Sequence, residues 1–322
     1  MRVVRIAEYG GPGVMRLEDL PTPAPGAGQV LVGLEAAGIN FIDVYHRTGQ
    51  YNVPLPYAMG IEGAGVVEAV GPGVTEIAPG ARVAWMGVPG SYASHCLVPV
   101  EKAVPVPSSL DGRSAAAVVL QGITAHYLSH STYPLRAGET CLVHAAAGGV
   151  GLLLTQVAKS RGARVLATVS TEQKATLARE AGADEVVLYT HEDFAAAARR
   201  LTGGAGVQVV YDSVGKDTFD KSLDCLAPRG MMVLYGQSSG AVPPLDLQVL
   251  NAKGSLFVTR PTAFHYTASR GELLSRSQDV FSWVADGSLR VRVGATFPLE
   301  EAAEAHRQLE ARKTTGKLLL LP

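Results

Sequence analysis

The stretch Thr140–Gly162, TCLVHAAAGGVGLLLTQVAKSRG, decides the fold expected for this chain. It opens with a short apolar run, Cys141–Val143, and passes into the glycine-rich segment His144–Gly151. Apolar residues then recur at helical spacing, at positions 150, 153, 154, 157 and 158, and the pattern ends before Gly162. This order predicts a strand, a tight turn and an amphipathic helix.

The glycine-rich segment matches two of the three glycines in the dinucleotide fingerprint G-x-G-x-x-G. Ala146 stands in the first position, and Gly148 and Gly151 fill the second and third. Gly148 lets the backbone approach a pyrophosphate, and Gly151 lets helix and strand pack closely, while N–H groups of the first helical turn can bind phosphate oxygens. A purely structural turn is the alternative, but the strand before it and the helix after it favour a dinucleotide site.

The end of the next predicted strand favours NADP(H) over NAD(H). An enzyme that uses NAD commonly holds the ribose 2′-hydroxyl with an acid about 20 residues after the glycine loop, but here Ser170 ends the strand. Lys174 follows one helical turn later and can neutralise a 2′-phosphate, although it also reads as an ordinary surface lysine. Glu172 argues the other way, but an acid in the first turn of a helix has a structural reason to be there.

Strand and helix patterns alternate after the glycine loop. Helices are expected at Glu172–Ala181 and Glu192–Leu201. The apolar runs typical of strands are Arg164–Val169, Glu185–Tyr189, Val207–Asp212 and Gly230–Tyr235. Repeated strand–helix units predict an α/β fold with a doubly wound parallel sheet.

The two ends of the chain have a different texture. Short strand-like runs bounded by Pro and Gly, at Gln29–Glu35, Gly63–Gly71 and Arg82–Trp85, predict a β-rich domain. The last 60 or so residues hold the helical patterns Gly271–Ala285 and Leu299–Ala311 and close with the strand-like run Lys317–Leu321. We expect them to return to the first domain.

Composition excludes several classes of partner. The 28 basic and 29 acidic residues nearly cancel, so no nucleic-acid partner is expected. No apolar stretch approaches the roughly 18 residues of a membrane span, and no signal-peptide pattern opens the chain, so a cytoplasmic protein without membrane insertion is expected. Three cysteines, Cys96, Cys141 and Cys225, form no CxxC motif and suggest neither a disulfide framework nor a sulfur-rich metal site.

Six segments spread along the chain carry a resemblance to a known family. They are Ala37–Asp43 (AGINFID), Met59–Gly65 (MGIEGAG), Gln121–Ala125 (QGITA), His144–Gly151 (HAAAGGVG), Tyr211–Gly215 (YDSVG) and Val258–Pro261 (VTRP). Together they resemble the zinc-independent quinone oxidoreductases of the medium-chain dehydrogenase/reductase superfamily, the branch that includes zeta-crystallin. The resemblance implies a GroES-like, partly open β-barrel substrate domain (residues 1–122 and 263–322) and a Rossmann NADPH-binding domain (residues 123–262), with the active-site cleft between them.

The resemblance also identifies zinc ligands that this chain lacks. Zinc-containing relatives carry a cysteine near Gly38, a histidine where Ile61 stands and a four-cysteine lobe, and only Glu62 remains of the usual His-Glu pair. One carboxylate without His or Cys neighbours makes no zinc site. His46 and His95 have no ligand-like spacing and read as ordinary side chains. No metal is expected.

Without zinc the chain lacks the Lewis acid that polarises a carbonyl, a contribution of several kcal/mol. The acceptor must then be a good electron acceptor by itself, and the resemblance implies a quinone. Two alternatives stay open. One is an NADPH-dependent reductase of α,β-unsaturated carbonyl compounds, and the other is a cofactor-binding structural or RNA-binding protein like the crystallin member of the family.

Three residues are implied at the catalytic end of the site by the resemblance: Asn40, Tyr45 and Tyr51. Asn40 also reads as the N-cap of a helix that begins at Phe41, since asparagine is a favoured N-cap. The two tyrosines can orient a quinone oxygen or relay a proton, but a phenol with a pKa of about 10 is a weak acid. Core or lid packing is the alternative for both.

The resemblance implies a longer list of cofactor contacts. These are Asn40, Gln121, Thr124, Gly148, Gly149, Val150, Ser170, Lys174, Tyr189, Ser213, Gly236, Ser238, Phe257, Val258 and Arg260. Tyr189 can contact the adenosine end or simply pack at a strand end, and Arg260 can pair with a phosphate or with a surface carboxylate. The family usually forms homodimers by joining Rossmann sheets edge to edge, and Gly254–Thr259 reads as an apolar edge strand that needs cover.

Overall fold

The computed structural model describes residues 1–322, which divide into two compact units. Unit 1 comprises Met1–Ile123 and Thr267–Pro322, and unit 2 comprises Thr124–Tyr266. The boundary between them falls within the long helix α2, Gly112–Tyr127. Unit 1 is therefore assembled from both ends of the chain, and unit 2 is one continuous insertion.

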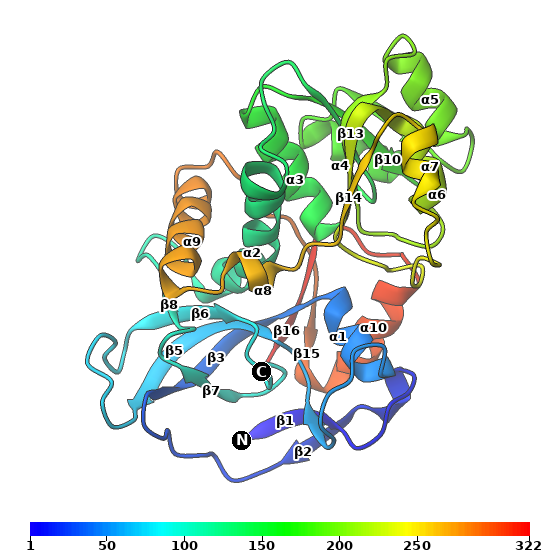
Figure 1. The fold of residues 1–322 in the computed structure, drawn as a ribbon. Helices are drawn as coiled ribbons and strands as arrows, with labels where there is room; N and C mark the ends of the chain where they lie inside the picture. Colours follow the sequence, from blue (N-terminus) through cyan, green and yellow to red (C-terminus); the bar gives the residue numbers. More distant parts are fainter. The chain divides into compact units, whose positions relative to one another are not determined.

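Unit 2 is built on a six-stranded parallel sheet with the strand order β11-β10-β9-β12-β13-β14. Figure 1 labels three of these strands, β10, β13 and β14. Its strands are β9 (Thr140–Val143), β10 (Arg164–Val169), β11 (Glu185–Leu188), β12 (Val207–Asp212), β13 (Leu226–Leu234) and β14 (Phe257–Thr259). Its helices are α3 (Gly149–Ser160), α4 (Glu172–Glu180), α5 (Phe194–Leu201), α6 (Phe219–Cys225), α7 (Gln248–Ala252) and α8 (Ala263–Tyr266), and a π-helix, Leu128–Thr132, extends α2. The doubly wound parallel sheet expected from the sequence is confirmed.

The order of the strands indicates where a sheet of this kind binds its ligand. From β9 the chain moves outward first through β10 and β11, and it then returns to β12 and continues to β13 and β14. Right-handed crossovers in the two directions place α3 and α4, which contact each other, on one face and the contacting pair α5 and α6 on the other. Ligands of such sheets bind outside the carboxyl ends of the strands where the order reverses, here beside β9 and β12.

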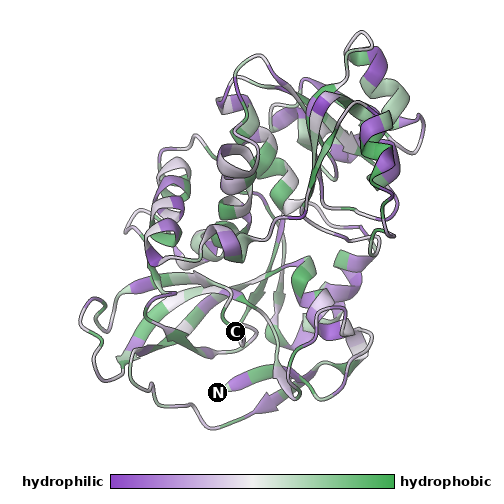
Figure 2. Cartoon of the chain, viewed as in Figure 1, coloured by the Kyte–Doolittle hydropathy of each residue, from purple (hydrophilic) through white to green (hydrophobic).

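A continuous apolar core explains why these segments form a sheet. β10 is buried from Val165 to Val169, and Leu142, Leu166 and Val210 lie in one cluster with the apolar faces of α5 and α6. Strands covered on both faces need nearly unbroken apolar runs, and that is the pattern of their sequences. Figure 2 colours the chain by hydropathy, and hydrophobic colour is seen on strands and helices in both units.

Unit 1 contains two sheets. The smaller one has the order β2-β1-β4, and the larger one has the order β15-β16-β3-β5-β6-β8, with β7 also paired to β3. The strands are β1 (Arg2–Ile6), β2 (Arg16–Asp19), β3 (Gln29–Ile39), β4 (Tyr57–Ala58), β5 (Glu62–Val70), β6 (Arg82–Met86), β7 (His95–Pro99), β8 (Val104–Pro105), β15 (Val293–Pro298) and β16 (Lys317–Leu321). The helices are α1 (Phe41–Thr48), α9 (Arg270–Ala285) and α10 (Ala302–Glu310), with short 3-10 turns at Pro12–Val14 and Leu299–Glu301.

The pairing of the last strand with β3 positions the candidate site of unit 1. β16 runs antiparallel to β3, with Leu318 opposite Ile39 and Leu320 opposite Ala37. This register places Lys317, the first residue of β16, beside the end of β3, where α1 begins. Residues almost 280 positions apart in the sequence therefore meet, because the last strand pairs with β3.

Several boundaries differ from the sequence-based expectation. Strand β13 begins at Leu226 and not at Gly230, because its first residue pairs with Val207 across an irregular register. Helix α5 begins at Phe194, because the Asp193 carboxylate caps the N–H groups of Ala195 and Ala196. The α10 segment begins with a 3-10 turn, and only Ala302–Glu310 is α-helical.

Candidate functional site

The loop His144–Gly151 joins β9 to α3 with a strained backbone at its start. Ala145 has φ +49°, in the left-handed region that a side chain disfavours, and it is exposed. The Ala145 carbonyl then accepts the N–H of Gly148 at 2.9 Å, and Gly148 is the N-cap of α3. Gly148, Gly149 and Val150 are all partly exposed at this helix start. The loop closes tightly although the first fingerprint glycine is Ala146.

Gly151 and Gly148 meet different surroundings. A Cβ on Gly151 would collide with the carbonyl oxygen of Ala145 and lie 2.7 Å from the Cα of Ala146, so the loop and α3 pack too closely for a side chain. A Cβ on Gly148 would meet only the Ala145 oxygen, at 3.2 Å. The bare backbone at Gly148 and the unpaired N–H groups that open any helix fit a phosphate group. The loop therefore suits the pyrophosphate of a dinucleotide.

His144 holds the start of the loop in place. Its ring nitrogens lie 2.8 Å from the hydroxyl of Thr168, on β10, and 2.9 Å from that of Ser222, on α6. Phe194 packs edge-on against the ring at 4.8 Å. Burial lowers the pKa of His144, so the imidazole stays neutral at physiological pH. This histidine braces the loop and is not exposed to a ligand.

The predicted residues after β10 gather at the start of α4. Ser170 directly follows the strand, and the hydroxyl of Thr171 caps the helix by accepting the N–H of Lys174 at 3.3 Å. The side chain of Glu172 is 72% exposed, and its carboxylate lies 3.8 Å from Arg179. Tyr189 follows β11, and its N–H donates to the carbonyl of Val169 at 3.2 Å. Ser170 and Tyr189 thus lie at the ends of neighbouring strands, and Lys174 lies in the first turn of α4.

Two further predicted segments meet after β12 and β13. The N–H of Ser238 donates to the carbonyl of Ser213 at 3.1 Å, and a Cβ on Gly236 would lie 2.7 Å from that same oxygen. The buried Asp212 carboxylate accepts the N–H groups of Val214 and Gly215 and the hydroxyl of Thr218, which fixes the turn. The predicted residues Ser213, Gly236 and Ser238 are therefore neighbours in unit 2.

The last cofactor candidates lie on and after the edge strand β14. Phe257 is 56% exposed and Val258 is 37% exposed, and both belong to β14, which pairs only with β13. Arg260 follows the strand, and its guanidinium donates to the carbonyl of Pro261 at 3.3 Å. The apolar edge strand predicted at Gly254–Thr259 is confirmed, with only its last three residues extended.

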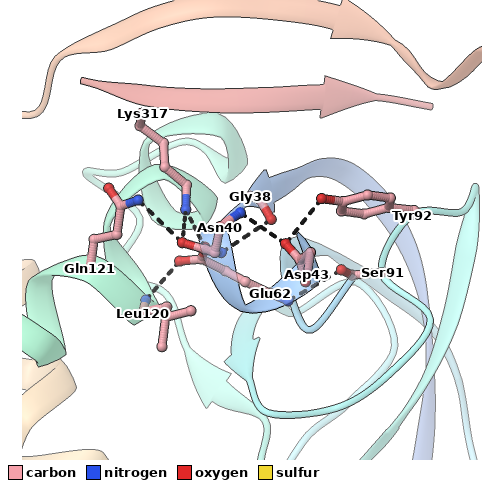
Figure 3. A network of polar contacts seen from close by, with 9 residues as sticks. All are labelled: Gly38, Asn40, Asp43, Glu62, Ser91, Tyr92, Leu120, Gln121 and Lys317. Atoms are coloured by element: carbon pink, nitrogen blue, oxygen red, sulfur yellow. Dashed lines mark hydrogen bonds and ion pairs between the residues drawn. The ribbon is translucent and has the colours of Figure 1, made fainter. Parts of the chain in front are cut away.

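Unit 1 holds a buried polar network centred on Asn40 (Figure 3). The Asn40 amide nitrogen donates to Glu62 at 2.7 Å and to the carbonyl of Gly38 at 3.3 Å. Its amide oxygen accepts from Lys317 at 2.9 Å and from Gln121 at 3.2 Å. Lys317 also forms an ion pair with Glu62, and their side chains are 1% and 0% exposed. Asn40 occupies the N-cap position of α1, but its carboxamide is committed to this network.

Glu62 and Gln121 extend the network to α2. The second oxygen of Glu62 accepts the backbone N–H of Leu120 at 2.7 Å. The side-chain oxygen of Gln121 is buried and has no hydrogen-bond partner. A buried acceptor without a donor costs roughly 1–3 kcal/mol, so such an atom marks a place where a ligand can donate. Thr124, also predicted, is buried one turn further along α2, at the start of unit 2.

A second buried chain of polar groups begins at Asp43. Its carboxylate accepts the N–H of Asn40 at 2.8 Å and the hydroxyl of Tyr92 at 3.0 Å. The Tyr92 hydroxyl lies 3.1 Å from His306, whose other ring nitrogen lies 3.0 Å from Arg47. Burial raises the pKa of Asp43 to about 7 and lowers that of His306 to about 3. Asp43 therefore titrates near neutral pH, while His306 stays neutral.

Tyr45 and Tyr51 lie together in an aromatic cluster on and after α1. Their rings meet edge to face with centroids 5.2 Å apart, and the N–H of Tyr51 donates to the carbonyl of Tyr45 at 3.0 Å. His46 and Tyr57 continue the cluster, with ring centroids 5.5 Å apart. Tyr45 is buried and Tyr51 is partly exposed. The two predicted tyrosines are thus brought together, and the network around Asn40 begins one turn earlier.

Sequence reasoning missed the residues that complete the unit 1 network. It treated Lys317 only as the start of a strand, and it gave no role to Asp43 or Tyr92. Their neighbours come from strand pairing over long separations, which leaves no local pattern. The sequence offers only a weak signal for Lys317, which is that it directly precedes the apolar run 318–321. A charged residue at such a position is more often exposed, so the signal does not predict burial.

Residues 1–322 contain no group of three or more His, Cys, Asp or Glu side chains arranged to hold a metal ion. None of the helices has the length and apolar character needed to cross a bilayer.

Comparisons with known proteins agree with this architecture. The model of the alcohol dehydrogenase GroES-like domain matches residues 26–108, and that of the zinc-binding dehydrogenase family matches residues 181–320. A quinone oxidoreductase of Pseudomonas aeruginosa is 47% identical over 99% of both chains, and a 2-haloacrylate reductase of a Burkholderia species is 45% identical over 98% of both. The crystal structure of Escherichia coli quinone oxidoreductase complexed with NADPH, 44% identical, superimposes over the full length of both chains with a TM-score of 0.98.

The doubly wound sheet, its glycine loop and the GroES-like unit define a medium-chain dehydrogenase/reductase. This class transfers a hydride with a nicotinamide cofactor. Within it, the full-length similarity is decisive: the chain belongs to the quinone oxidoreductase family. The resemblance stated from the sequence and the expected fold class are both confirmed.

Proposed function

We propose that this chain is an NADPH:quinone reductase that works without a metal. The observation that carries the proposal is the phosphate-binding geometry of unit 2. The bare backbone of Gly148 opens α3, Ser170 directly follows β10, and Lys174 lies in the first turn of α4. Full-length relatives named quinone oxidoreductases, one of them solved with NADPH, support the assignment.

Unit 2 is proposed to bind the cofactor. Backbone N–H groups at Gly149 and Val150 hold the pyrophosphate at the start of α3, where the helix dipole also attracts negative charge. Lys174 neutralises the 2′-phosphate, which Ser170 does not repel. Ser213, Gly236 and Ser238 form the adjacent wall at the ends of β12 and β13. Tyr189, Phe257, Val258 and Arg260 complete the proposed cofactor contacts, together with Thr124 on α2.

Unit 1 is proposed to serve the reacting end. Bound NADPH supplies a hydride, and the acceptor gains stability because reduction makes its ring aromatic. The chain's own task is then to position the reactants, which is where orientation contributes most to rate. Gln121 offers a hydrogen-bond acceptor, and Asn40 holds it in place. The partly exposed Tyr51, supported by the buried ring of Tyr45, provides an aromatic surface for a planar quinone.

A homodimer is proposed through the edge of the unit 2 sheet. β14 ends the sheet with unpaired backbone groups and the exposed side chains of Phe257 and Val258. An uncovered apolar edge strand invites pairing with a second copy. We also propose a cytoplasmic location, in keeping with three buried cysteines that form no disulfide.

One specific observation favours a second candidate function, the reduction of activated alkenes. The Burkholderia relative at 45% identity is named a 2-haloacrylate reductase. The two functions share a cofactor and differ in the acceptor, so a panel of acceptors separates them. With NADPH oxidation followed at 340 nm, the proposal expects 1,4-naphthoquinone to give a kcat/KM at least about tenfold above those of 2-chloroacrylate and of simple enones. A higher value for 2-chloroacrylate would replace the first function by the second.

A further inference from the structure

Lys317 is a cation enclosed in unit 1 and held by groups of known hydrogen-bonding character. Its ammonium donates to the Asn40 amide oxygen at 2.9 Å and forms an ion pair with Glu62. Both side chains of the ion pair are essentially inaccessible to solvent. An ammonium can only donate and a carboxylate can only accept. The pair therefore presents a donor and an acceptor to Asn40 in a fixed order.

This order determines which way the Asn40 carboxamide is turned. The amide oxygen must face Lys317, and the amide nitrogen must face Glu62, 2.7 Å away. With a second donation to Gly38 and a second acceptance from Gln121, both hydrogens and both lone pairs of the carboxamide are used. Asn40 therefore has no hydrogen-bonding capacity left for a ligand.

The orientation of the Asn40 carboxamide determines the orientation of the Gln121 carboxamide. Because the Asn40 oxygen needs a donor, Gln121 turns its nitrogen toward it, at 3.2 Å, and turns its own oxygen away. That oxygen is buried and has no hydrogen-bond partner, and Gln121 is only 9% exposed. If Asn40 were reversed, Gln121 would have to present its oxygen to Asn40 and its nitrogen to the site.

We propose that Lys317 is a positioning residue of the reductase: through Asn40 it holds Gln121 so that the site presents a hydrogen-bond acceptor to the cofactor. The inference rests on the proposed function. It deepens that function by naming the chemistry recognised, which is a hydroxyl or amide N–H donor. A quinone has carbonyl oxygens and no donor, whereas the cofactor carries ribose hydroxyls and a carboxamide. The contact is thus assigned to NADPH and not to the acceptor.

Gly38 makes room for this arrangement. A Cβ on residue 38 would collide with Glu62 and lie 2.8 Å from the Cε of Lys317. Any larger residue at this position displaces the ion pair. The glycine, the cation and the carboxylate therefore form one unit, assembled from β3, β5 and β16.

The experiment replaces the ion pair by a neutral pair of similar shape. Lys317→Met combined with Glu62→Gln removes both charges together, so no uncompensated charge stays buried, and such replacements are often tolerated. Asn40 is then free to turn over. We expect the dissociation constant for NADPH, measured by fluorescence without a quinone, to rise about five- to tenfold. We expect the KM for 1,4-naphthoquinone to stay within about twofold of the wild-type value, and the melting temperature within about 5 °C.

A double-mutant cycle shows whether Lys317 acts through Gln121. Gln121→Met removes the acceptor itself and should weaken NADPH by a similar factor, and adding the neutral pair to that variant should cause no further loss. Arg2→Met with Glu300→Gln, which removes an exposed ion pair of the same unit, is the control and should change neither constant.

The outcomes separate this inference from the proposed function. A folded neutral-pair variant that binds NADPH as tightly as the wild type overturns the role of Lys317, as does an equal loss in the presence and absence of Gln121. If the neutral pair does not fold, the cycle is run with a second neutral pair, Lys317→Gln with Glu62→Gln, which also removes both charges and lets Asn40 turn over, and the same loss of NADPH affinity is required. Wild-type protein that binds NADPH but reduces no quinone contradicts the proposed function and leaves this inference standing.

Discussion

The loop His144–Gly151 of unit 2 and the network around Asn40 of unit 1 both present hydrogen-bonding groups, but they are built in opposite ways. The loop consists of eight consecutive residues and works mainly through its backbone, with Gly151 allowing close packing. The network joins side chains of Asn40, Glu62, Gln121 and Lys317, up to 277 positions apart. The loop therefore depends on local shape, whereas the network depends on a balance of buried charges. Each region should fail in its own way.

The largest effect is expected from unbalancing the charges of the network. Lys317→Met alone leaves the Glu62 carboxylate buried without its counter-charge, and the free energy of unfolding should fall by about 3–5 kcal/mol. Adding Glu62→Gln should restore most of the lost free energy of unfolding, because it removes the unpaired charge. Urea unfolding of the two variants measures both values. Equal stability of the single and double variants would show that charge balance does not hold this region together.

Asp43 should make the stability of unit 1 depend on pH. Its pKa is raised from 3.8 to about 7 by burial, so the native state holds the proton more tightly than the unfolded chain. The stabilisation that comes from this tighter proton binding is complete below about pH 4 and is lost as the pH rises through 7. Between pH 5 and pH 8 the free energy of unfolding of the wild type should fall by about 2–3 kcal/mol relative to Asp43→Asn. Parallel curves for the two proteins over that interval would refute the assignment.

In the loop, substitutions at two glycines should separate the effect on stability from the effect on NADPH binding. Gly151→Ala forces a Cβ against the backbone of Ala145 and Ala146, and it should lower the free energy of unfolding by about 2–3 kcal/mol. Gly148→Ala meets only one atom, at 3.2 Å, so it should leave stability within about 1 kcal/mol while weakening NADPH. Thermal melts and cofactor titration of both variants test the contrast, which fails if Gly148→Ala binds NADPH like the wild type.

The smallest effect concerns cofactor choice. Lys174→Glu should raise the KM for NADPH about tenfold, equivalent to about 1.4 kcal/mol, with little change in the KM for NADH. The reason is that only NADPH carries the 2′-phosphate. Lys174→Gln serves as the matched variant, since it removes the charge without adding a repulsive one, and should give an intermediate value. Equal changes in both Michaelis constants would remove Lys174 from the phosphate site.

The contrast between the two regions also explains what the sequence could predict. The strands Arg164–Val169, Val207–Asp212 and Lys317–Leu321 were predicted with the observed bounds, because each is an apolar run between turn residues. The glycine loop was predicted because its pattern is contiguous. The edge strand was also found, although only Phe257–Thr259 is extended.

The network around Asn40 could not be predicted in the same way. Asn40 offered two interpretations, a helix cap and a site residue, and only the pairing of β16 with β3 shows where its carboxamide is directed. A buried lysine is rare, so a lysine at the start of a strand is expected to face solvent. Asp43 likewise reads as an ordinary acid in a first helical turn, and its raised pKa depends on burial that no local pattern encodes.

The most direct test of the central claim is the steady-state oxidation of NADPH and of NADH by 1,4-naphthoquinone, after dialysis of the protein against a metal chelator. An NADPH:quinone reductase without a metal should keep its full turnover after dialysis and show a kcat/KM for NADPH at least about tenfold above that for NADH. Loss of turnover that zinc restores, or equal efficiency with the two cofactors, would contradict the account.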